Sequence, residues 1–144
     1  MFHNKTSRIV LFATVYCIAF SFLGLAFAGG NVPLKGSFSG VGPDFSGNFT
    51  HLGRFDGYIE LFTATWTAAN GDQVNANTLD FEVDMTNACP DGFVGYRQQL
   101  GIDGGTGRFE NAVGGATVTG CINFDTGEYD GYLYGTISRP NSKN

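Results

Sequence analysis

The fold is decided by a glycine-rich stretch, Gly104-Gly-Thr-Gly-Arg-Phe-Glu-Asn-Ala-Val-Gly-Gly-Ala116. Three of its glycines suit a backbone that turns sharply through positive φ: Gly104, Gly105 and Gly107. Three of its apolar residues have the spacing of a single helical turn: Phe109, Ala112 and Val113. A strand-like run over 116–124 follows at once. The stretch therefore predicts a strand, a tight turn, a one-turn apolar plug and a second strand.

The rest of the chain favours strands and turns, because no segment longer than one turn keeps a helical period. We expect strands at 34–39, 45–62, 63–68, 73–84, 93–102, 116–124 and 129–137. The 45–62 run is either one long strand or two strands joined by a bulge at Gly53. These seven or eight antiparallel strands fit a sandwich or a barrel. Glycines within the strands suit the sharp curvature of a small barrel: Gly36, Gly53, Gly95, Gly131 and Gly135.

The decisive stretch also resembles the Gly-Thr-Gly-x-Phe-x-x-Ala-x-Gly signature of allene oxide cyclase and dirigent-like barrels. The segment Thr50-His-Leu-Gly-Arg-Phe55 is similar to one in bacterial secreted proteins of that group. The resemblance covers most of 34–137 and implies an all-β fold, a small closed antiparallel barrel of about eight strands. In both plant families the barrel is a cup that acts mainly by confinement. No catalytic residue of either family matches a position here.

The first residues have the pattern of a secretory signal peptide. Lys5 and Arg8 precede an uncharged apolar run over 9–28, which ends in the cleavage signal Ala26-Phe-Ala28. We expect residues 1–28 to be removed, leaving 29–144 as a single domain that is secreted or periplasmic. The alternative is an uncleaved membrane anchor, because about 20 apolar residues can span a bilayer.

The charge of the expected mature chain argues against two classes of partner. All 13 acidic residues lie after residue 28, and the net charge there is −7. The six basic residues in that part are Lys35, Arg54, Arg97, Arg108, Arg139 and Lys143. Nucleic acids and anionic membrane surfaces attract basic patches, so neither is an expected partner. The charge is that of a soluble secreted surface.

Two cysteines remain after cleavage, Cys89 and Cys121. An even pair in an exported domain predicts one disulfide, which stabilises by about 3–4 kcal/mol in the chain-entropy model. The weaker alternatives are a catalytic thiol and a metal site. The expected mature chain has a single histidine, and the spacing matches no zinc pattern. We therefore expect neither a metal nor another cofactor.

Two groups of polar residues are candidates for chemistry. His51 and Arg54 are an acid–base or anion-holding pair if the strand bulges at Gly53, and otherwise have structural roles. Three alternating acids follow on one strand: Asp80, Glu82 and Asp84. They form a solvated face that guards against edge pairing, a calcium site, or an acidic lining of the barrel interior.

Aromatic residues on several strands are the remaining candidates: Trp66, Tyr96, Tyr132 and Tyr134. They either line an amphipathic pocket for a small apolar ligand or pack in the core. We expect a non-catalytic binding or structural domain, with a cyclase or isomerase as the alternative. A large cavity with a buried polar group would favour the enzyme, and a filled interior the binding domain. A homo-oligomer is left open.

Overall fold

The computed structural model describes residues 30–141 and is an all-β closed barrel of eight antiparallel strands. Each strand pairs with the next one in sequence, and β1 pairs with β8 to close the barrel. The elements are β1 Asn31–Val41, β2 Asp44–Phe49, β3 Gly53–Glu60, β4 Thr63–Ala68, β5 Gln73–Val83, β6 Val94–Gly105, η1 Gly107–Phe109, β7 Val113–Ile122 and β8 Glu128–Ser138. The predicted signal peptide, 1–28, lies outside the described residues. Within them, no helix is long and apolar enough to cross a membrane.

The barrel confirms the predicted fold class, and one segment differs from the sequence prediction. The 45–62 run is neither one long strand nor two strands joined by a bulge. It forms the antiparallel hairpin β2–β3, whose turn is followed by Gly53 at a φ of 73°. His51 lies in this turn with a φ of 69°, a region that few residues other than glycine adopt. The register irregularities lie instead in β5, between Val74 and Ala76 and between Thr78 and Asp80.

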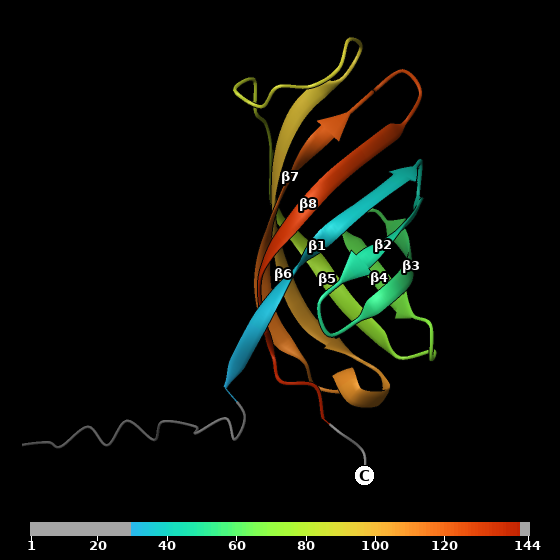
Figure 1. Ribbon diagram of the computed structural model, residues 1–144, viewed down its shortest axis with the longest axis vertical. Coiled ribbons are helices and arrows are strands. Elements are labelled where there is room, and N and C mark those ends of the chain that lie inside the picture. Colours follow the sequence, from blue (N-terminus) through green and yellow to red (C-terminus); the bar gives the residue numbers. More distant parts are fainter. Residues whose placement is uncertain (1–29, 142–144) are drawn as a thin grey trace, which may run out of the picture.

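The strands differ in length, so the two ends of the barrel differ in shape. Strands β2, β3 and β4 are short, with 6, 8 and 6 residues, whereas β5 to β8 have 10 to 12. Figure 1 shows the short strands on one side and the tall β6, β7 and β8 on the other. We call the end with the β3–β4 and β5–β6 connections the upper end. The lower end carries the β2–β3, β4–β5 and β6–β7 connections.

Side chains fill the barrel interior, because each strand alternates inward apolar residues with outward polar ones. Trp66 contacts the rings of Phe49 and Phe55 at centroid distances of 5.2 and 6.3 Å. Other fully buried side chains are Leu34, Val74, Phe109, Val118, Leu133 and Ile137. Among residues 30–141, no polar or charged side chain is buried. The interior is therefore a packed core.

The glycine-rich stretch closes the lower end, as its apolar spacing predicts. Phe109 is 1% exposed at the end of the short helix η1, and Ala112 is buried beside it. Val113 differs from the prediction, because it begins β7 and is exposed. Gly104 and Gly107 have the expected positive φ values, 103° and 60°. Gly105 instead lies against the carbonyl oxygen of Gln73, where a side chain would not fit.

Candidate functional site

The upper end has an open strand edge on β5. Strand β5 pairs with β4 only from Gln73 to Asn77, and the last bond on that side joins the Thr78 N–H to the Phe62 carbonyl at 2.7 Å. Beyond it, β5 continues to Val83 with β6 as its partner. Residues 79–83 therefore present an unpaired edge within the described part of the chain. Unpaired edges can accept another strand.

Exposed apolar side chains surround this edge. The two-residue turn between β3 and β4 carries Leu61 and Phe62, which are 89% and 73% exposed. On β5, three further apolar side chains are exposed: Leu79, Phe81 and Val83. We call these five residues the apolar step, since the turn lies below the part of β5 that runs past it. Apolar groups concentrated at one end of a protein indicate a contact surface.

Tyr96 of β6 supports the inner side of the apolar step. Its ring stacks on Phe81 at a centroid distance of 5.5 Å, and its hydroxyl donates to the Asp130 carbonyl oxygen at 3.1 Å. Burial, with the charge of Asp130, raises the pKa of Tyr96. Burial likewise raises the pKa of Tyr129. Both hydroxyls therefore stay protonated at neutral pH and act as hydrogen-bond donors.

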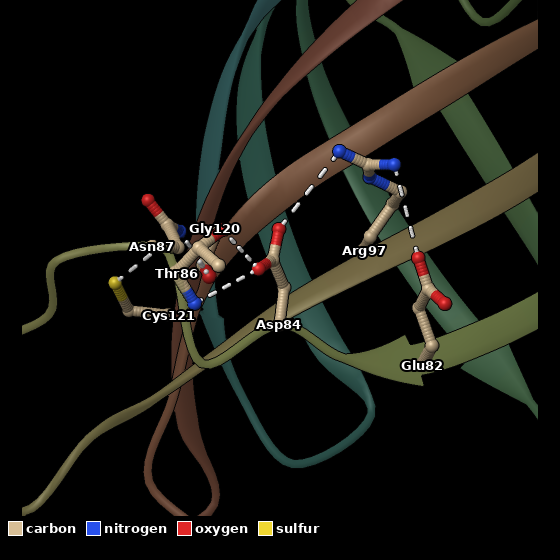
Figure 2. Close-up of polar contacts among 7 residues, drawn as sticks. All are labelled: Glu82, Asp84, Thr86, Asn87, Arg97, Gly120 and Cys121. Carbon is tan, nitrogen blue, oxygen red and sulfur yellow. Dashed lines mark hydrogen bonds and ion pairs between the residues drawn. The ribbon is translucent and has the colours of Figure 1, made fainter.

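The acidic residues of β5 lie on the outer face of the barrel. Arg97 of β6 lies 3.8 Å from Glu82 and 3.9 Å from Asp84. Figure 2 shows its side chain between these two carboxylates. Asp80 has no ion pair within residues 30–141, and both Asp80 and Glu82 are exposed. The sequence interpretation of these acids as an interior lining is therefore wrong. Their position fits the solvated strand face.

Asp84 fixes the end of β5. Its carboxylate accepts hydrogen bonds from the hydroxyl and from the backbone N–H of Thr86, the latter at 3.0 Å. The Thr86 hydroxyl is the main reason that the pKa of Asp84 lies below its usual 3.8, and Arg97 lowers it further. The Asp84 N–H also donates to the Gly95 carbonyl at 2.8 Å. These bonds hold β5 against β6 up to its last residue.

The loop that follows is held to β7. Cys89 and Cys121 form the predicted disulfide, with an S–S distance of 2.06 Å and a Cα–Cα distance of 5.8 Å. The Asn87 side-chain amide donates to the Gly120 carbonyl at 2.9 Å, next to Cys121 (Figure 2). The pairing rules out a free catalytic thiol at either cysteine. The tall side of the upper end is thus fixed covalently, while the edge of β5 stays open.

The six candidate ligand-pocket residues do not lie in one pocket. Trp66 and Tyr96 are buried and point into the barrel. Tyr132 and Tyr134 are about half exposed on the outer face of β8. The remaining two line different depressions of the surface: His51 with Arg108 and Arg139, and Arg54 with Asp56 and Thr67. His51 and Arg54 thus line separate surface depressions.

Sequence reasoning missed the open edge and the apolar step. The expected strands 63–68 and 73–84 already differed in length, and a longer strand beside a shorter one must run past it. The sequence prediction includes Leu61 and Phe62 in a strand, whereas the structure has them in the turn between β3 and β4. The signal was therefore in the strand lengths and not in any motif. Comparisons with protein-family models, curated proteins and solved structures found no match to this chain.

Proposed function

We propose that the chain is a secreted, non-catalytic binding or structural domain, built as a barrel of the allene oxide cyclase or dirigent-like kind. The packed interior is the observation that carries this proposal. The cavity between Trp66, Leu133 and their neighbours has a volume of about 50 Å³. Pockets that enclose a small organic ligand measure about 300–1,000 Å³. The interior at this cavity therefore has room for about one or two water molecules.

The polar groups near this cavity also support a non-catalytic role. Gln98 and Thr78 line it, and the Gln98 amide donates to the Thr78 hydroxyl at 2.7 Å. Both side chains are uncharged, and no charged side chain is buried among residues 30–141. A general acid or base works best with a pKa near neutral pH. Three groups have a shifted pKa, and each shift leads away from neutral pH: the pKa of Asp84 is lowered, and those of Tyr96 and Tyr129 are raised.

The alternative, a cyclase or isomerase that confines an apolar substrate, requires a cavity as large as its substrate. The packed interior weighs against it. Under the proposal, a small apolar ligand contacts the exposed side chains of the apolar step and does not enter the barrel. The acidic surface and the disulfide are consistent with an exported protein.

Benzene binding to the purified protein and to a Leu133→Ala variant tests this proposal. Leu133 is buried and lines the small cavity, so its truncation enlarges an apolar space that can hold benzene. We expect benzene to raise the melting temperature of the variant and not that of the wild type. Native mass spectrometry of wild-type protein from its host should show no retained small molecule. A drug-sized ligand that quenches Trp66 fluorescence at one equivalent would overturn the proposal.

A further inference from the structure

We propose that the open edge of β5 binds an extended peptide in which basic and apolar residues alternate. The peptide adds a strand beside residues 79–83, in line with β4 and above the β3–β4 turn. This inference rests on the proposed function, because it assigns binding to the upper edge and not to the interior.

The backbone geometry of β5 leaves hydrogen-bonding groups free for such a strand. Residues of an antiparallel strand point their N–H and C=O groups alternately to either side. The backbone N–H of Asp84 donates to the Gly95 carbonyl of β6. The backbone N–H and C=O groups of Glu82 and Asp80, two and four residues earlier, therefore also point toward β6. Those of Phe81 and Val83 therefore point to the open side. The register shift at Leu79 produces this arrangement, because Thr78 before it still donates toward β4.

The two faces of the edge differ in chemistry. Phe81 and Val83 lie on the inner face, 45% and 50% exposed, and Phe81 rests on the buried ring of Tyr96. Asp80 and Glu82 lie on the outer face. An added strand also alternates its side chains between faces. Its inward residues would contact apolar groups and its outward residues would contact carboxylates.

Charge selects a basic peptide over a second copy of this chain. Two β5 edges paired antiparallel about Phe81 would set Asp80 opposite Glu82 of the other copy. Like charges directly opposite one another destabilise a sheet. Arg97 compensates part of this charge, but Asp80 has no ion pair among the described residues. Lysine or arginine at alternate positions of a peptide would pair with Asp80 and Glu82 and also suit the acidic chain as a whole.

The test uses a fluorescent peptide of about seven residues that alternates lysine with valine, long enough to span the edge. Its control alternates glutamate with valine. We expect anisotropy titrations to show at least about tenfold tighter binding of the lysine peptide, from two additional charge pairs. Bound peptide should slow hydrogen exchange at the Phe81 and Val83 amides. Equal affinity for both peptides, or unchanged exchange at these amides, would overturn the proposal.

Variants separate the edge from the general acidity of the surface. Asp80→Asn with Glu82→Gln should remove the preference for lysine, whereas Asp56→Asn on the outer face of β3 should leave it unchanged. Val83→Pro removes an edge donor without removing a bond to β6, and should abolish binding. Valine N-methylation in the peptide gives the same test without altering the protein. Binding that survives N-methylation would overturn strand addition.

Two further outcomes distinguish this inference from the proposed function. Self-association through β5, detected by sedimentation and abolished by Val83→Pro, would replace the peptide with a second copy of the chain and overturn the inference. A ligand inside the barrel would instead refute the proposed function. Failure of peptide binding alone leaves the packed interior and the benzene result as they stand.

Discussion

The two ends of the barrel are built on opposite principles. At the lower end, Leu52 and Phe109 are buried, so side chains from two connections close the core. At the upper end, the apolar step is exposed, and a disulfide and the bonds of Asp84 fix the tall strands. One end thus gains stability by burying apolar surface, and the other keeps apolar surface accessible. The contrast indicates that the lower end maintains the fold and the upper end is available for contact.

The largest expected effect is at the lower end. Phe109→Ala should reduce the free energy of unfolding by about 3–5 kcal/mol, because it empties a buried aromatic site. Phe62→Ala at the upper end should change it by about 0.5 kcal/mol or less, because Phe62 is exposed. Urea unfolding of both variants measures the difference. Equal losses would remove the contrast between the two ends.

Arg108→Ala is a matched control beside Phe109. The Arg108 side chain is partly exposed, lies 3.3 Å from the Asp72 carboxylate and stacks over the Phe109 ring. An exposed ion pair contributes about 0–1 kcal/mol, so the loss should be far smaller than for Phe109→Ala. A lid over a ligand site would show the opposite pattern, with Phe109→Ala leaving the melting temperature unchanged and abolishing ligand binding.

Removal of the disulfide should have the next largest effect. It joins residues 32 apart, so Cys89→Ser with Cys121→Ser should cost about 3–4 kcal/mol in the chain-entropy model. Hydrogen exchange should show that the loop before β6 loosens first, while the amides around Phe109 change only with global unfolding. If exchange became faster only at the lower end, the disulfide would not be what stabilises the upper end.

Gly107→Val should cost about 1–3 kcal/mol through backbone strain and a clash. Gly107 has a φ of 60°, and a Cβ atom there would overlap the Asp72 carboxylate. Gly104→Val is the matched control, because Gly104 also has a positive φ but open space around it. Thermal melts should therefore rank Gly107→Val as the more destabilised variant. If Gly104→Val were the more destabilised variant, backbone strain and not the clash with Asp72 would determine the loss of stability.

The smallest expected effect concerns the titration of Asp84. Since its folded pKa is depressed, Asp84 contributes stability above its unfolded pKa, and this is lost as the pH falls through the folded value. NMR titration should give a pKa below 3.8 for the wild type. Thr86→Val removes the principal hydrogen bond and should raise that pKa. Arg97→Gln should raise it less, and a larger effect of Arg97→Gln would show that charge dominates.

The fold was largely predictable, because its determinants are local. Alternating residues mark the strands, and the turn at Asn70-Gly71 lies between β4 and β5 as expected. The plug was predictable because Phe109 and Ala112 lie one helical turn apart. The β2–β3 turn was not, because His51 adopts a positive φ that its residue type does not reveal.

The candidate site was much less predictable. The open edge depends on how far β5 runs past β4, which is a property of two strands together. The aromatic candidates do not share one pocket, because strand alternation turns Tyr96 inward but Tyr132 and Tyr134 outward. Sequence identifies which residues share a strand face, and the register of the whole barrel decides which face is inside.

The order of the strands has a consequence for how the barrel folds. Seven of the eight pairings join strands adjacent in sequence, and the remaining one joins β1 to β8, with Asn31 opposite Ser138. Hairpins close short loops and form quickly, whereas the β1–β8 pair must close nearly the whole domain at once. We therefore expect this seam to form last. If the pairing between β1 and β8 opened, each strand would have a long unpaired edge. The closed pairing therefore also protects the protein from aggregation.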